Sequence, residues 1–194
     1  MTSDTALRGT RMPRSERRAQ LLDAAREVFV ERGYHAAAMD EIAVRAGVSK
    51  PVLYQHFPGK LDLYLALLDI SIDEFVDSVI HALDSTSDNK RRVAAAMETF
   101  FAFVGGQGDT FRLLFENDLT NADAVRGRLD SLTRRCAEAI APVIAEDTGL
   151  SNEESQLLAA GMVGMAQVAA RFWLASDGSL PRPDATSLVA TLGW

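Results

Sequence analysis

The side chains best suited to chemistry are crowded into one short stretch, residues 49–60. Hydroxyl, ammonium, phenol, amide and imidazole groups follow one another there without a carboxylate. Hydroxyl, ammonium and backbone N–H groups bind phosphate, an amide can read an adenine edge, and apolar groups can contact a thymine methyl. The stretch is therefore suited to contact duplex DNA. The candidate contacts, including one upstream residue for the phosphate backbone, are Ser49, Lys50, Pro51, Val52, Tyr54, Gln55, His56, Lys60 and Met39.

Each of these side chains also has a purely structural explanation. A lone surface tyrosine or histidine usually has no function, so only the surrounding residues make Tyr54 and His56 candidates for DNA contact. Val52 and Gln55 are equally compatible with base contact and with a plain surface. Leu53 and Phe57 have the spacing of core residues and are expected to lock their helix in place.

The sequence lacks a catalytic or metal-binding constellation. It contains no GxSxG, HExxH, P-loop or GxGxxG motif. Its three histidines, His35, His56 and His81, are far apart, and its one cysteine, Cys136, can form neither an internal disulfide nor a cysteine-rich metal site. The glycine-rich run at 105–108 lacks a following Lys-Ser or Lys-Thr pair and is interpreted as a helix stop. We therefore expect no catalytic residue, no metal, no cofactor and no enzymatic activity.

Charge is distributed unevenly along the 194 residues. Residues 1–60 hold ten Lys or Arg against seven Asp or Glu, whereas residues 61–194 hold ten against twenty, and the formal net charge is −7. A basic head on an acidic body fits DNA binding by one end of the molecule. The polar N-terminus and the lack of a long uninterrupted apolar run predict a cytoplasmic protein with no membrane contact.

The head that positions the candidate DNA contacts is predicted to span 13–59, after a flexible arm at 1–12. Apolar residues recur at helical spacing in its first segment, and Gly33 supplies a left-handed stop. Two short helices then follow with Gly47 in their turn, which is the pattern of a helix-turn-helix. The predicted helices of the head are 14–32, 39–45 and 50–57.

Residues 60–194 are predicted to form a helical-bundle domain for ligand binding and dimerisation. Apolar residues recur at three- and four-residue spacing, and no segment shows the strict alternation of a half-buried strand. Pro142 is expected to kink or end its helix, because proline removes a helical N–H. The whole chain is thus predicted to be all-α, with about nine helices. The predicted helices of the body start with one that begins at Lys60. They lie near 60–83, 90–104, 110–115, 121–142, 151–174 and 184–192.

Large apolar residues on the inner faces of the body helices could line a pocket for an apolar small molecule. Helical bundles offer such pockets, and methionine thioethers adapt to different ligands. The same pattern fits a filled core, which periodicity alone favours. The candidate lining residues are Phe75, Val79, Leu83, Met97, Phe100, Phe103, Val104, Leu132, Cys136, Ile140, Met162 and Met165.

The predicted helix at 50–57 would enter the major groove as the recognition helix, and its small size predicts a dimer. A single short helix offers too small an interface for a specific site, so we expect a homodimer on a palindromic double-stranded operator. The helix at 151–174 is rich in small residues such as Gly161 and Gly164, which let helix backbones approach closely. We expect this helix, with the long one before it, to pack against its symmetry mate.

The stretch from Phe29 to Lys60 resembles the DNA-binding signature of the TetR family. The shared elements are Gly33-Tyr34, Ile42-Ala43, Ala46-Gly47-Val48-Ser49, Leu53-Tyr54, His56-Phe57 and Lys60. The resemblance implies a transcription regulator that binds DNA, and it favours the functional interpretation of Tyr54 and His56.

A narrower resemblance extends into the body. Four segments are similar to TetR-family regulators of fatty-acid synthesis, which sense long-chain acyl-CoA: Arg32–His56, Leu61–Leu67, Arg112–Asp118 and Gly161–Trp173. This resemblance implies an effector that is a long-chain acyl-CoA or a similar lipid and that releases the protein from its operator; Pro142 departs from the pattern. The main alternative is a repressor of an efflux or catabolic operon that senses another apolar molecule. A DNA-binding module without an effector is disfavoured by the apolar body.

Overall fold

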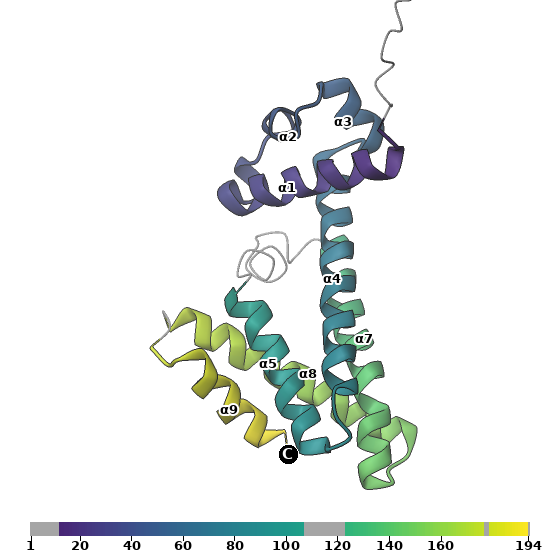
Figure 1. The fold of residues 1–194 in the computed structure, drawn as a ribbon, viewed down its shortest axis with the longest axis vertical. Helices are drawn as coiled ribbons and strands as arrows, with labels where there is room; N and C mark the ends of the chain where they lie inside the picture. Colours follow the sequence, from purple (N-terminus) through teal and green to yellow (C-terminus); the bar gives the residue numbers. More distant parts are fainter. Residues whose placement is uncertain (1–11, 107–122, 177–178, 194) are drawn as a thin grey trace, which may run out of the picture. The chain divides into compact units, whose positions relative to one another are not determined.

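The computed structural model describes residues 12–106, 123–176 and 179–193. Within these ranges it contains eight helices and no strand, which confirms the all-α prediction (Figure 1). The helices are α1 (Arg14–Ala36), α2 (Met39–Arg45), α3 (Lys50–His56), α4 (Lys60–Asp84), α5 (Asn89–Gly106), α7 (Asp123–Thr148), α8 (Asn152–Ala175) and α9 (Arg182–Leu192).

The chain divides into two compact units, residues 1–64 and 65–194, with the boundary inside α4. The predicted helix at 110–115 and residues 1–11 of the predicted arm lie outside the described residues. Helix α7 continues six residues past Pro142, to Thr148, and the other described helices begin and end within four residues of the predicted bounds.

The first unit is a three-helix head. Leu21 of α1, Ile42 of α2 and Leu53 of α3 are fully buried in its core. The ring of Tyr64, from the start of α4, lies edge-on to Phe29 with 5.2 Å between ring centroids. Since α2 and α3 have only seven residues each, they are too short to be stable alone and depend on docking against α1.

Two glycines shape the head. Gly33 has a φ of 71° and a non-helical backbone inside α1, so the predicted stop is present, although helical residues resume as far as Ala36. Gly47 has a φ of 65° in the turn between α2 and α3. Both lie in the left-handed region that disfavours a side chain, and so glycine permits the tight helix-turn-helix connection.

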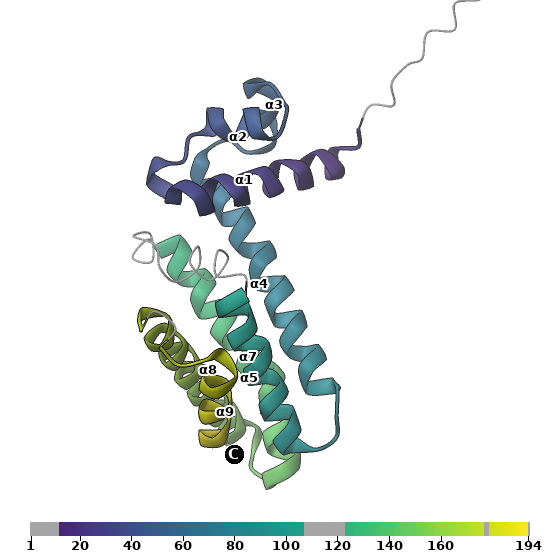
Figure 2. The same cartoon turned by 60° about the vertical axis from the view of Figure 1, so that its left-hand side comes forward.

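The second unit packs α5, α7, α8 and α9 with the remainder of α4 (Figure 2). The most extensive helix pair is α7 with α8, and α5 packs against α9. Ala137, Ala141 and Ala159 meet between α7 and α8, with Ile140 and Ile144 packed alongside. Small side chains therefore allow these two helices to approach closely.

In the body, a local sequence signal marks the start of α8, whereas Pro142 does not mark the end of α7. Ser151 caps α8 and forms a reciprocal capping box with Glu154, as expected for serine followed three residues later by glutamate. In contrast, α7 continues through Pro142 to Thr148, so the proline does not end its helix. Pro142 and Glu138 are both exposed, and water can therefore satisfy the Glu138 carbonyl that loses its helical donor.

Candidate nucleic-acid interface and ligand pocket

Helix α3 presents most of the predicted DNA contacts on one exposed surface. Ser49 occupies its N-cap position without a side-chain capping bond, and a proline fills the first turn. Lys50, Tyr54 and Gln55 are exposed, and Leu53 and Phe57 are buried as predicted. The buried pair holds the helix on the head, so the opposite face is left for a partner.

A concave surface joins this face to the N-terminus of α1. It encloses about 780 Å³ and is lined on the α3 side by Ser49, Val52, Gln55 and His56. The α1 side contributes Arg14 and Arg17, which the sequence interpretation did not single out. Their spacing of three residues at the start of a helix puts two guanidinium groups on one side, where they suit phosphate.

His56 is half-buried in this concave surface. Its pKa lies below the usual value of 6.5, first because burial disfavours the charged ring and then because Arg14, Arg18 and Arg17 repel it. The free protein therefore favours a neutral imidazole at neutral pH. A phosphate beside the ring would offset the repulsion from the arginines and so favour the imidazolium.

Two lysines with predicted phosphate contacts already have partners in the protein. Lys50 pairs with Asp40 at the exposed surface, where such pairs exchange readily. Lys60 donates to the carbonyl oxygens of Tyr34 (2.8 Å), His35 (3.1 Å) and Ala37 (2.9 Å). Lys60 thus has a structural role at the end of α1, and its phosphate contact stays a prediction.

Met39 is the predicted contact that the structure supports least. Its side chain is buried, with 9% of the residue exposed, in the core between α2 and its neighbours. A thioether in this position is poorly placed to contact DNA, and the Met39 contact stays a prediction. Sequence alone could not separate the start of α2 from a surface contact, because the direction of the side chain depends on how α2 docks.

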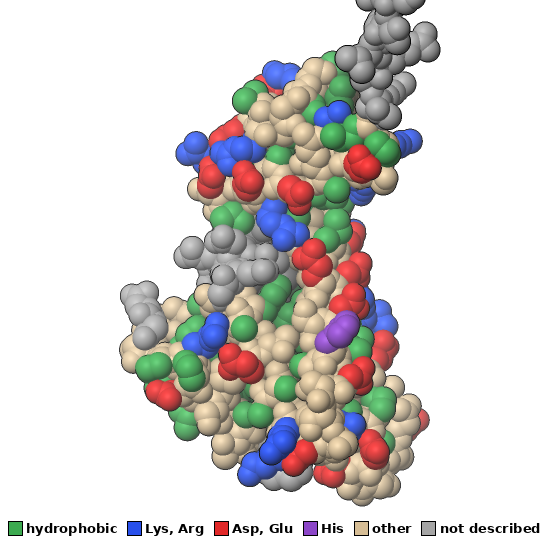
Figure 3. Space-filling model, viewed as in Figure 1, with side chains coloured by type: hydrophobic (Ala, Val, Ile, Leu, Met, Phe, Trp, Pro, Cys, Tyr) green, Lys and Arg blue, Asp and Glu red, His purple; other side chains and the backbone are tan. Residues whose placement is uncertain are grey.

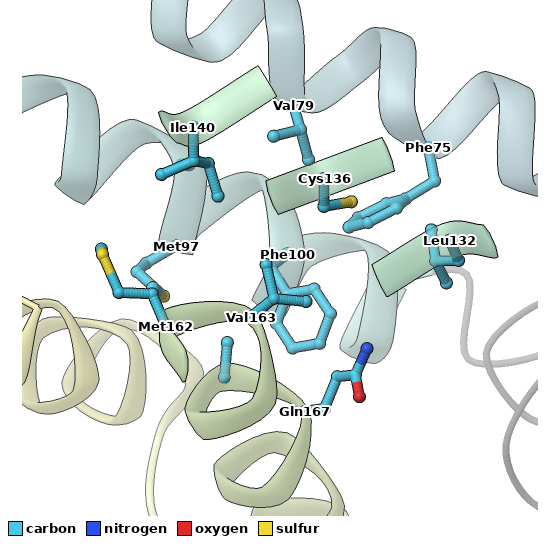
Figure 4. Close-up of a pocket in the computed structure, with 12 residues that line it drawn as sticks. Phe75, Val79, Met97, Phe100, Leu132, Cys136, Ile140, Met162, Val163 and Gln167 are labelled. Carbon is cyan, nitrogen blue, oxygen red and sulfur yellow. The ribbon is translucent and has the colours of Figure 1, made fainter. Parts of the chain in front are cut away.

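The body contains a small apolar cavity between α4, α5, α7 and α8 (Figure 4). Its volume is about 40 Å³, far below the roughly 300–1,000 Å³ of typical small-molecule sites. Eight predicted residues line it: Phe75, Val79, Met97, Phe100, Leu132, Cys136, Ile140 and Met162. The remaining wall comes from Ala96, Val163, Ala166 and Gln167, which sequence reasoning did not select.

Few polar atoms face this cavity. The Gln167 amide donates to Thr133 Oγ1 at 3.1 Å, and burial raises the pKa of the Cys136 thiol to about 11. Cys136 is therefore a neutral apolar neighbour and not a nucleophile. Among the described residues, no group of three or more His, Cys, Asp or Glu side chains could hold a metal ion.

Four predicted lining residues lie elsewhere. Leu83 lines a second, larger cavity next to the first. Phe103, Val104 and Met165 line neither of these two cavities. Phe103 instead packs on Phe75 with 4.6 Å between ring centroids, and Val104 is fully buried. Helical spacing placed them on inner faces, but packing buries Val104 in the core and leaves Phe103 half-buried.

The second cavity has a volume of about 540 Å³. It shares Ala96, Met97, Ile140 and Met162 with the small cavity. Its outer part is polar and includes Asn89, Arg92, Asp147 and Thr148. Arg92 precedes Ala96 and Phe100 at four-residue steps along α5, and this spacing was the available signal that the arginine belongs to the same face.

Charge differs between the two units as the sequence predicts. Acidic side chains gather along α4 in the body (Figure 3), where Asp69, Asp73, Glu74 and Asp77 are exposed. Arg128 and Arg135 of α7 pair with Asp69 (2.7 Å) and Asp73 (2.6 Å). An acidic surface is repelled by phosphate, so this part of the body is poorly suited to contact DNA.

Family models match both parts of the chain. Residues 21–67 match the model described as bacterial regulatory proteins, tetR family. Residues 78–194 match the model described as a tetracyclin repressor-like C-terminal domain. Together they include both the helix-turn-helix and the bundle with its cavities.

A curated relative is similar over nearly the whole chain. The HTH-type transcriptional activator FasR of Mycolicibacterium smegmatis is 46% identical over 187 residues, which is 96% of this chain and 85% of that protein. An alignment of this length extends over both units of the chain.

Solved structures share the fold. A TetR-like regulator from Rhodococcus sp. RHA1 is 30% identical with a TM-score of 0.73 and covers 95% of this chain and 97% of its own. FadR of Bacillus subtilis, solved in complex with stearoyl-CoA, has a TM-score of 0.75 at 20% identity and covers 90% and 96% of the two chains. The chain belongs to the TetR family of bacterial transcriptional regulators, and these relatives are DNA-binding regulators and not enzymes.

Proposed function

We propose that this protein regulates fatty-acid or lipid synthesis genes in the cytoplasm and that a long-chain acyl-CoA releases it from its operator. The observation that carries the proposal is the apolar cavity of the body, built by four helices and almost devoid of polar groups. It occurs in a chain that is 46% identical to FasR, and B. subtilis FadR, with the same fold, was solved with stearoyl-CoA.

The head supplies the DNA contacts in this proposal. Residues 13–59 bind the operator through α3, with Arg14 and Arg17 of α1 on flanking phosphates. Gln55 and Val52 face the base edges, and Ser49, Lys50, Tyr54 and His56 bind the backbone. The Mycolicibacterium relative is named an activator, so we propose that operator binding by this chain activates transcription.

Residues 60–194 bind the effector and form the homodimer in this proposal. Leu157, Val168 and Phe172 of α8 are 75%, 61% and 77% exposed. With Gly161 and Gly164 they recur at three- and four-residue steps and form one face, which we call the α8 stripe. A Cβ built on either glycine meets nothing within 4 Å, so another helix has room to approach closely. A two-fold dimer through the α8 stripe would cover it and match a palindromic operator.

The composition of α8 agrees with this role. By length and composition alone, α8 is long and apolar enough to cross a membrane. One such helix is weak support for a membrane span, because core and interface helices share these properties. Ala159, Val163 and Ala166 are buried in the bundle, and the α8 stripe holds the three most exposed large apolar side chains of the helix.

The closed cavity explains how an effector could act. A volume of about 40 Å³ cannot hold a long acyl chain, so the chain requires a different packing of α4, α5, α7 and α8. Each buried methylene contributes about 0.8 kcal/mol, which favours the expanded state. A ligand that binds one state better shifts the population toward it. Helix α4 lines the cavity with Phe75 and Val79 and itself begins in the head at Lys60, so we propose that it transmits the change.

Operator binding with graded acyl-CoA esters tests this function. We expect palmitoyl-CoA or stearoyl-CoA to weaken binding of a labelled operator, measured by fluorescence anisotropy, and acetyl-CoA or butyryl-CoA to have no effect. Equal affinity with and without saturating long-chain acyl-CoA would refute the proposal. That outcome would favour the alternative, a regulator of an efflux or catabolic operon with another apolar effector.

A further inference from the structure

One side chain of the head, Gln20, bridges two segments that line the concave surface beside α3. Its amide nitrogen donates to the carbonyl oxygen of Ala46 at 2.9 Å, 26 residues away along the chain. Its amide oxygen accepts from Arg17 Nη1 at 2.7 Å. A carbonyl can only accept and a guanidinium can only donate, so each end of the amide matches one partner. Gln20 thereby connects the start of α1 to the end of α2.

The bond to Ala46 holds the turn of the helix-turn-helix. Ala46 is the C-cap of α2 and is only 4% exposed. The amide N–H groups of the next two residues, Gly47 and Val48, donate to carbonyls within α2, both at 3.0 Å. A buried carbonyl without a donor costs stability, and Gln20 supplies the donor here. Since Gly47 and Val48 line the concave surface, this bond fixes one of its walls.

The bond to Arg17 holds the opposite wall. Arg17 is half-buried and lines the concave surface together with Ser49 and His56. A guanidinium has several N–H donors, so the bond from Nη1 to Gln20 is compatible with further bonds to a phosphate. An arginine that is already held in one orientation loses less conformational entropy when it binds. Gln20 therefore prepares Arg17 for an anion.

Another arginine of the head is held in a different way. Arg45 of α2 pairs with the carboxylates of Glu27 at 3.0 Å and Glu31 at 2.8 Å. A carboxylate competes with phosphate for a guanidinium, because both form charge-assisted bonds with it. The amide of Gln20 is neutral, so it orients Arg17 and leaves the positive charge available. This difference favours Arg17 over Arg45 as a partner for DNA phosphate.

We infer that Gln20 is a positioning residue for operator binding. Its amide sets the distance between the Arg17 guanidinium and the turn before α3, so that both meet the phosphate backbone together. The inference rests on the phosphate contact of Arg17 in the proposed function and adds the residue that prepares this contact. Gln20 acts through its two partners, so its loss should remove the contribution of Arg17 and add nothing to it.

A double-mutant cycle tests this coupling. The probe is a labelled operator duplex that the unchanged chain selects from a random library, and binding is measured by anisotropy at several salt concentrations. We expect Arg17→Met to weaken binding about ten-fold and to reduce the salt slope by about one. Gln20→Met should weaken binding about three- to ten-fold, and the double variant should bind within about two-fold of Arg17→Met. Additive losses in the double variant would overturn the inference.

Arg18→Met is the matched control for the cycle. Arg18 is also an arginine at the start of α1, but its guanidinium lies over the Phe57 ring, 4.3 Å from the ring centroid. The effects of Arg18→Met and Gln20→Met should therefore add. Coupling of Gln20 to Arg18 as strong as its coupling to Arg17 would indicate a general distortion of the head and would also overturn the inference.

A second variant separates positioning from folding, because Gln20→Met also leaves the Ala46 carbonyl without its donor. Gln20→Lys can still donate to that carbonyl but offers Arg17 no acceptor. We expect it to unfold within about 2 °C of the unchanged chain and to reduce the effect of Arg17→Met to less than about three-fold. A full ten-fold effect of Arg17→Met in the Gln20→Lys background would assign Gln20 to folding alone, and only this inference would fail. If Arg17→Met binds as the unchanged chain does, with the same salt slope, the proposed phosphate contact fails with it.

Discussion

Lys60 Nζ lies 2.8 Å from the carbonyl oxygen of Tyr34 and 4.6 Å from the centroid of the Tyr34 ring. The ammonium also donates to the carbonyl oxygens of His35 and Ala37. These three carbonyls belong to the segment that follows the Gly33 break in α1. The first residue of α4 thus fixes the end of α1 by hydrogen bonds and a cation–π contact.

Substitution of Lys60 should therefore lower stability as well as DNA affinity. We expect Lys60→Met to reduce the free energy of unfolding by about 1–3 kcal/mol, because three charge-assisted bonds and a cation–π contact are lost. Urea denaturation measures this, with Lys50→Met, whose pair with Asp40 is exposed, as a control expected to change little. If Lys60→Met keeps full stability but flattens the salt dependence of operator binding, then phosphate contact is the main role of Lys60.

Lys50 and Gln55 should affect operator binding in different ways. Lys50→Ala is expected to weaken binding to all sequences and to reduce the salt slope by about one, because it removes a phosphate contact. Gln55→Ala should relax preference at one base pair by about 1–3 kcal/mol if its amide binds a base edge in two places. Anisotropy titrations against operator variants at several salt concentrations separate the two effects. Equal losses on every sequence for Gln55→Ala would assign Gln55 to the backbone.

His56 should give stability and DNA affinity opposite dependences on pH. Its pKa is lowered in the folded head by burial and by neighbouring arginines, so the unfolded chain binds a proton at higher pH than the folded one. The free energy of unfolding should therefore fall as pH decreases through about 6.5. Operator affinity should rise over the same change, because phosphate favours the imidazolium. His56→Gln should flatten both profiles, and an operator affinity independent of pH in the unchanged chain would argue against the phosphate contact.

The α8 stripe should control the oligomeric state. Phe172→Glu places a charge in the proposed dimer interface and is expected to give a monomer with at least about ten-fold weaker operator binding, because one short recognition helix gives too small an interface. Gln156→Glu adds the same charge at another exposed position of α8 and should stay dimeric. Analytical ultracentrifugation at micromolar concentration distinguishes them. A dimeric Phe172→Glu variant would place the interface on another surface.

Phe100 should influence the effector response without changing the free DNA-binding activity. Its buried ring lines the small apolar cavity of the body and lies edge-on to Phe75, with 5.7 Å between ring centroids. Phe100→Leu enlarges the cavity and is expected to shift the most effective acyl-CoA toward longer or bulkier chains, at a cost of about 1–2 kcal/mol in stability. The acyl-CoA concentration that halves operator binding measures the shift. An unaltered response would mean that the effector does not occupy this cavity.

The sequence by itself determined the head and most helix bounds, because these depend on local features. Gly33 and Gly47 permit the positive φ values that their turns require, and Ser151 with Glu154 forms the box that starts α8. Helical spacing also identified Leu53 and Phe57 as core. The motif from Phe29 to Lys60 was sufficient to indicate the family, since it fixes both the turn geometry and the groups presented to DNA.

Only the tertiary structure decided which inward-facing residues surround a cavity and which polar groups are already engaged. Spacing gives the face of a helix but not the helix that opposes it, so Phe103 and Phe100 looked equivalent until packing placed only Phe100 beside the cavity. Long-range contacts likewise gave Lys60 its carbonyl partners, which lie more than twenty residues away along the chain. Arg92 lines the second cavity because α5, α7 and α9 converge there, an arrangement set by the packing of whole helices and not by any local pattern.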